Sequence, residues 1–214
     1  MKKILFVMLL ATSVISNAAL LSYEQGNLQI EGVNLNRTAA VTDPSGAATN
    51  MKMDLLGAGL RSKTVLFVGV KVYVLQLFAD NKPQFSRDAN AVTSLNPAQF
   101  VAIKINMLRT VDAATLAVSF REAIQANGIA IDAELTTLLN LIETSADGVS
   151  GKSISLLLKS TPAGTNVYYE DTNGQLKSFS GTASIKAKIL SIWLGKPADP
   201  GLAALKASLL KPVY

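Results

Sequence analysis

The longest apolar segment of the chain, TVLFVGVKVYVLQLF at residues 64–78, carries apolar side chains at both odd and even positions. Its many β-branched residues favour a strand over a helix, and two apolar faces predict a strand that is covered on both sides. Alternation places Tyr73 on one face and Val72 and Val74 on the other. Gly69 is a position where this strand can bend.

Shorter alternating segments flank it. Residues 98–108 place Val101 and three further apolar side chains on one face, with Lys104 on the other face, toward solvent. Residues 29–41 read as one or two short strands, in which Gly32 marks a slip in the alternation and predicts a β-bulge. The polar segment TDPSGAATN, at 42–50, predicts a turn.

The rest of the chain predicts helices and further strands. Asp112 is a suitable N-cap for a helix that Asn127 and Gly128 end. Asn173 and Gly174 predict a hairpin turn between two strands. The predicted helices are 110–128, 132–146, 182–195 and 197–210, and the predicted strands are 153–161, 165–171 and 175–179.

The predicted elements therefore run as strands, two helices, strands and two helices. Strand runs separated by helix runs indicate an α+β fold, with an antiparallel sheet and helices on one face. We expect a single domain over residues 19–214, because a chain of that length buries roughly 70% of its unfolded surface.

The first residues, MKKILFVMLLATSVISNA, have the three zones of a secretory signal peptide. Two lysines precede an apolar stretch, which is too short to span a bilayer, and small residues follow it. We expect cleavage after Ala18 and a periplasmic or secreted protein without a membrane anchor. Loss of Lys2 and Lys3 lowers the net charge from +5 to +3.

Composition excludes several kinds of chemistry. The chain has no cysteine and no histidine, which removes disulfides, a Ser-His-Asp triad and the usual zinc ligands. Basic residues are scattered rather than clustered, so nucleic acid is not an expected partner. Neither a phosphate-binding loop nor a dinucleotide fingerprint is complete, since Ala146 and Ser62 stand where glycines are required. We expect no metal and no cofactor.

One charge calls for an explanation. Arg61, in GAGLRSK, opens the longest apolar segment; Asp54 is the nearest carboxylate before it, and none follows until Asp80. Either Arg61 pairs with Asp54 beside a cleft filled by side chains, or the fold holds it ready for an anionic ligand. Tyr73, inside the buried strand, needs a hydrogen-bond partner, whereas Trp193 is expected in the core.

Two segments taken together resemble a known family. GAGLRSKTVLFVGVKVYV and ILSIWLGKPADPGLAALKASLL, with FREAIQANG and GKSISLLL between them, resemble chalcone isomerase-like proteins, specifically their exported bacterial branch. The resemblance covers residues 28–210. It implies an open-faced β-sandwich, in which a long curved antiparallel sheet is backed by helices, with a ligand cleft between them.

The resemblance also implies roles for single residues. Arg61 matches the arginine that positions substrate and stabilises a phenolate in the plant enzymes of the family. Their active-site threonine falls at Val68, their tyrosine and asparagine at Asp112 and Ser119, and a last hydroxyl at Ile192. The arginine is kept and most of these polar groups are not. Other members bind fatty acids without catalysis, through the arginine and a tyrosine.

We therefore expect a lipid- or fatty-acid-binding protein, with Arg61, Tyr73 and Ser119 at the ligand. A guanidinium forms two parallel charged hydrogen bonds to a carboxylate and keeps its proton. The alternative is an isomerase acting on a phenolic or enone substrate, in which Arg61 stabilises an oxyanion and Lys63 or Tyr73 donates a proton. Both hypotheses predict a small amphipathic carboxylate or phenolic ligand.

Overall fold

The computed structural model describes residues 19–42, 51–65 and 68–214, which form an eight-stranded antiparallel sheet with its strands in chain order. The predicted leader and most of the turn at 42–50 lie outside the described residues. The strands are β1 (Leu21–Ile30), β2 (Val33–Val41), β3 (Lys52–Val65), β4 (Val68–Ala79), β5 (Phe100–Met107), β6 (Ser153–Thr161), β7 (Gly164–Glu170) and β8 (Leu176–Gly181).

The helices lie in two connections between strands and after the last strand. The short η1 (Lys82–Gln84) and α1 (Ala91–Ser94) lie between β4 and β5, α2 (Ala113–Ala126) and α3 (Ala133–Glu143) between β5 and β6, and α4 (Ser184–Leu194) and α5 (Pro200–Leu209) after β8. Within the described ranges, no helix is both long and apolar enough to cross a bilayer. The four longer helices confirm those predicted from periodicity; the two short ones were not predicted.

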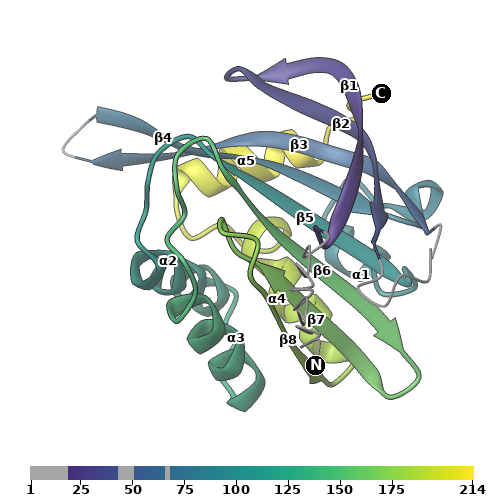
Figure 1. Cartoon of the computed structure of the whole chain (residues 1–214). Helices are drawn as coiled ribbons and strands as arrows, with labels where there is room; N and C mark the ends of the chain where they lie inside the picture. The colour runs from purple at the N-terminus through teal and green to yellow at the C-terminus, as the bar shows by residue number, and fades with distance from the viewer. Residues whose placement is uncertain (1–18, 43–50, 66–67) are drawn as a thin grey trace, which may run out of the picture.

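The sheet is covered on both faces, which explains the apolar residues on both sides of β4. Helices α2 to α5 gather on one face, and β1 and β2 cross the other (Figure 1). On the helical face, Leu75 and Ile103 belong to the same buried cluster as Leu116. On the opposite face, Val74 and Phe78 are buried in a second cluster beneath β1 and β2. The α+β fold with a backing of helices is confirmed.

The predicted single strand at 64–78 is wrong. Its first residues end β3 and its remainder forms β4, with Leu66 and Phe67 outside the described residues. The two strands pair antiparallel over most of their length, so Arg61 lies opposite Tyr73. Because both strands are apolar close to the reversal, periodicity does not reveal where the chain turns back.

A bulge in β4 also overturns the predicted alternation around Tyr73. Arg61 pairs with Tyr73, but Ser62 pairs with Lys71, so Val72 is an extra residue on β4. A bulge shifts the side-chain alternation by one residue. Val72 and Tyr73 therefore contact the same buried cluster, while Val74 lies in the other.

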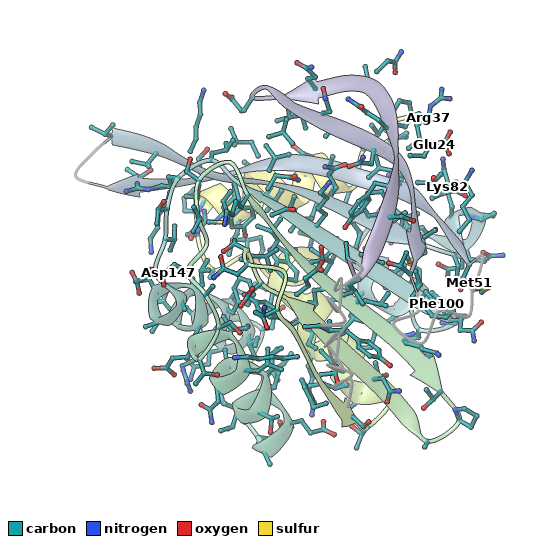
Figure 2. The ribbon with its side chains drawn as sticks, in the orientation of Figure 1. Glu24, Arg37, Met51, Lys82, Phe100 and Asp147 are labelled. Carbon is teal, nitrogen blue, oxygen red and sulfur yellow. The ribbon has the colours of Figure 1, made fainter. Side chains whose placement is uncertain are left out.

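Two further expectations fail near β1 and β2. Gly32 is no bulge: with Glu31 it forms the two-residue turn of the β1–β2 hairpin, at φ values of 76° and 51°. Lys104 does not point to open solvent, because its Nζ lies 3.9 Å from the ring centroid of Tyr23. Glu24 of β1 and Arg37 of β2 are exposed to solvent (Figure 2).

The helix and turn signals are confirmed where their chemistry is local. The Asp112 carboxylate accepts a hydrogen bond from the Thr115 N–H at 2.7 Å, as expected of an N-cap. Asn127 caps the end of α2, and Gly128 has a φ of 71°. Gly174 has a φ of 75° in the turn between β7 and β8.

Candidate functional site

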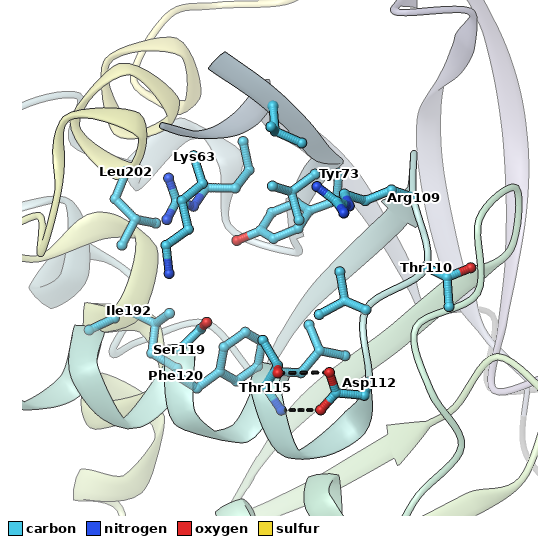
Figure 3. Close-up of a pocket in the computed structure, with 16 residues that line it drawn as sticks. Lys63, Tyr73, Arg109, Thr110, Asp112, Thr115, Ser119, Phe120, Ile192 and Leu202 are labelled. Carbon is cyan, nitrogen blue, oxygen red and sulfur yellow. Dashed lines mark hydrogen bonds between the residues drawn. The ribbon is translucent and has the colours of Figure 1, made fainter. Parts of the chain in front are cut away.

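A cavity of about 340 Å³ lies between the β3–β4 hairpin, α2 and the residues that lead into α2 (Figure 3). One part of its wall is apolar and the other part is polar and charged. The main apolar lining residues are Val70, Val72, Leu116, Phe120, Ile192 and Leu202. The bulge in β4 shapes this wall, since it lets both Val72 and Tyr73 reach the cavity.

The three predicted ligand-binding residues lie together in this cavity. Arg61, Tyr73 and Ser119 come from β3, β4 and α2, and all three belong to its lining. Arg61 and Tyr73 are neighbours across the β3–β4 pair. Ser119 lies on the opposite wall, one helical turn after Thr115 (Figure 3). The three residues therefore share one cavity, and their role in ligand binding stays a prediction.

Both predictions for Arg61 are wrong: it is neither paired with Asp54 nor held without a partner for an anionic ligand. Its guanidinium already has another carboxylate partner. Nη1 donates to Asp199 Oδ1 at 2.8 Å and Nη2 donates to Asp199 Oδ2 at 2.5 Å. Nη1 also donates to the carbonyl oxygen of Ser62. Asp199 lies 138 residues away in sequence, and the proposed partner Asp54 instead pairs with Ala79 in the sheet.

Small residues around Arg61 explain how this pair forms. A side chain at Gly57 or Gly59 would collide with α5, so the two glycines let α5 lie directly on β3. A side chain at Gly201 would collide with Arg61 Nη1 and the Ser62 carbonyl oxygen. The segments GAGLR and DPG therefore form one joint between β3 and α5, a signal that was present in the sequence and was missed.

Asp199 serves both the ion pair and the helix. As N-cap of α5, it accepts a hydrogen bond from the Leu202 N–H at 2.9 Å. Partial burial acts to raise the pKa of Asp199, but the Leu202 N–H and the hydrogen bonds and charge of Arg61 outweigh burial, so the pKa lies below its ordinary value. The carboxylate is ionised at neutral pH, and the positive charge of Arg61 is offset.

Tyr73 supplies a hydroxyl at the same end of the cavity. Its oxygen accepts a hydrogen bond from Trp193 Nε1 at 3.0 Å. Burial raises the pKa of Tyr73 to about 12, against the opposing effects of Trp193 and Arg61. The hydroxyl therefore keeps its proton at neutral pH, and that proton can be donated to a ligand. Trp193 is 3% exposed, which confirms it as a core residue.

The positions matched to the isomerase active site are only partly brought together. Asp112, Ser119 and Ile192 line the cavity, whereas Val68 is 64% exposed at the far end of β4. Asp112 is committed to capping α2. The firmly held proton of Tyr73 makes it a weak acid for catalysis. The isomerase hypothesis stays a prediction.

Two further features of the cavity were not predicted. Arg109 lines it and adds a positive charge to that of Lys63, which the isomerase hypothesis named as a proton donor. Behind Phe120 and Ile192, which line both spaces, lies a second, wholly apolar void of about 10 Å³ between the sheet and the helices. Over the described residues, no group of acidic side chains is arranged to hold a metal ion.

A family model described as chalcone isomerase-like matches residues 27–211. The chain belongs to the chalcone isomerase-like family. Its structure is similar to the crystal structure of a fatty-acid binding protein from Arabidopsis thaliana, with a TM-score of 0.61. The two are 17% identical, and the match covers 87% of this chain and 96% of the plant protein. No curated protein sequence gives a significant match.

Proposed function

We propose that this protein binds a fatty acid or a similar lipid in the cavity between the β3–β4 hairpin and α2. The observation that carries the proposal is a cavity with an apolar wall and a polar end, of about 340 Å³. That volume lies within the range of about 300–1,000 Å³ found for small-molecule sites. Similarity in fold to a plant fatty-acid binding protein supports the same ligand class.

The apolar wall would supply most of the affinity. Each buried methylene contributes about 0.8 kcal/mol, so an acyl chain of about ten methylenes contributes on the order of 8 kcal/mol before ordering costs. A single hydrogen bond to a charged group contributes about 1.5–3 kcal/mol. The polar end would therefore orient the ligand rather than hold it.

Arg61 and Tyr73 would act at that polar end. The Tyr73 hydroxyl donates to the ligand head group while Trp193 holds its oxygen. The bonds to Asp199 and Ser62 use three of the five guanidinium N–H groups of Arg61. Its Nε–H and one Nη2–H are left for a ligand oxygen, so Arg61 anchors the head group as a hydrogen-bond donor within an ion pair.

We also propose that the protein is exported and belongs to the exported bacterial branch of the family. The leader-like residues 1–18 support this. Expression of the whole chain in a bacterium, followed by mass spectrometry of the periplasmic fraction, should give a polypeptide that begins at Ala19. An uncleaved chain that stays in the cytoplasm would contradict export.

The binding test uses delipidated protein and dodecanoic acid, with affinity measured by calorimetry. We expect one acid per chain, and affinity about tenfold weaker in Tyr73→Phe because one hydrogen bond to a charged group is lost. Tyr168→Phe is the matched control, since Tyr168 lies on the other face of the sheet. A wild-type protein that binds no acid, or equal affinity in Tyr73→Phe and wild type, would overturn the corresponding part of the proposal.

A further inference from the structure

The charges around the cavity do not act equally on a ligand. Of the residues that the structure describes, four charged ones line it: Arg61, Lys63, Arg109 and Asp112. The charge of Arg61 is offset by Asp199, whose carboxylate oxygens lie 2.5 and 2.8 Å from the guanidinium nitrogens. A close bidentate pair presents a small net charge to a group beyond it. The electrostatic preference of the cavity must come from the other three.

Lys63 and Arg109 differ from Arg61, since no carboxylate of the described residues pairs with either of them. Among the described residues, neither takes part in an ion pair or a side-chain hydrogen bond, whereas Lys52, Lys71 and Lys188 each pair with a glutamate or an aspartate. The two cations approach the cavity from different elements, β3 and the segment between β5 and α2. In Figure 3, the Lys63 side chain extends into the space above Ser119.

Asp112 offsets only part of this positive charge. Its carboxylate accepts hydrogen bonds from the N–H and the hydroxyl of Thr115, both at 2.7 Å. It therefore faces the N-terminus of α2, whose partial positive charge it neutralises in part. Two unpaired cations against one capping carboxylate leave an excess of positive charge at the cavity mouth.

We infer that Lys63 and Arg109, rather than Arg61, select an acidic head group over a neutral one. The inference rests on the proposed lipid-binding function and assigns the specificity of that same site. Arg61 and Tyr73 then fix the position of the head group by hydrogen bonds, which an alcohol also accepts. The two unpaired cations act only on a negative charge. The preferred ligand class is an amphiphile with an anionic head.

The test measures the affinity of dodecanoic acid and of dodecanol for the same protein, and takes the ratio as the acid preference. Both cations are exposed, so solvent screens them: we expect Lys63→Gln and Arg109→Gln each to lower the ratio about threefold, and the double variant about tenfold. Dodecanol affinity should not change. The ratio in wild type should also fall as salt is raised, because exposed charges are screened.

Removing a negative charge from the cavity lining gives an independent test of the inference. Asp112→Asn keeps a good N-cap but removes a negative charge, so it should raise the acid preference by about threefold. Lys211→Gln is the control, since Lys211 is exposed after the end of α5 and does not line the cavity.

The outcomes separate the two proposals. If wild type prefers the acid and the ratio changes in these directions, the assignment of Lys63 and Arg109 holds. If wild type binds both ligands and the glutamine variants keep the same ratio, the assignment is overturned while lipid binding stands. If wild type binds neither ligand, both proposals fail.

Discussion

Asp199→Asn tests the joint between β3 and α5 by removing one charge while keeping a good N-cap for α5. Removing one partner of a buried ion pair costs about 3–5 kcal/mol, because the other charge is left without compensation. Here the Arg61 side chain is 8% exposed, but that of Asp199 is 33% exposed. Solvent screening at Asp199 lowers the expected cost to about 2–3 kcal/mol.

Asp199→Ala removes the cap as well, and should cost about 1 kcal/mol more than Asp199→Asn. Urea denaturation at pH 7, followed by tryptophan fluorescence, measures the free energy of unfolding of the wild type and both variants. A double-mutant cycle with Arg61→Gln isolates the interaction energy of the pair. The loss of stability in the double variant should be smaller than the sum of the losses in the two single variants. A loss below about 0.5 kcal/mol in Asp199→Asn would refute a stabilising ion pair, because exposed pairs give that little.

The pH dependence of stability follows from the same carboxylate. The pKa of Asp199 is lower in the folded protein than its ordinary value of 3.8, so the folded state favours the ionised form. This contribution is complete above the ordinary pKa and is lost as the pH falls through the lower, folded pKa. The difference between wild type and Asp199→Asn should therefore be constant from pH 7 to about pH 5, and shrink below about pH 4. An equal difference at pH 7 and pH 3 would contradict the assignment.

Two further substitutions probe the joint and the cavity wall. Gly201→Ala should destabilise the protein by about 1–3 kcal/mol at every pH, because the new methyl group would collide with Arg61 and Ser62 without altering a charge. Urea denaturation measures this loss. An unchanged free energy of unfolding would mean that α5 does not lie so close to β3. Phe120→Ala removes the wall between the cavity and the inner apolar void, so it should cost about 3–5 kcal/mol of stability. In competition binding, it should also shift the preference toward acyl chains longer than twelve carbons. An unchanged chain-length preference would show that the ligand does not reach Phe120.

Elements with local signals were predicted well from the sequence. The helix that begins after Asp112 and ends at Asn127 depends on caps within a few residues of each other, and the turn at Gly174 depends on one backbone conformation. The reversal between β3 and β4 was missed because apolar residues continue on both sides of it. The bulge at Val72 was missed because it is defined by pairing with another strand.

The sequence pointed to residues that lie close together but did not reveal the ion pair of Arg61. Arg61, Tyr73 and Ser119 line one cavity, and their role in binding stays a prediction. The partner of Arg61 could not be found by looking for nearby acids, because Asp199 is 138 residues away and reaches Arg61 only when α5 packs on β3. The glycines that permit this packing, Gly59 and Gly201, were visible in the sequence. Their role depends on a distant element, because Gly59 of β3 faces α5 and Gly201 of α5 faces β3.

The position of Trp193 gives the protein a reporter of its own cavity. It is the only tryptophan of the chain, and it contacts two residues of the cavity wall: its Nε1 donates to Tyr73, and Phe120 packs edge-on against its ring with centroids 5.2 Å apart. A ligand that displaces either neighbour changes the polarity around the indole. The intrinsic emission spectrum should therefore shift on titration, so that occupancy can be followed without any added dye or label.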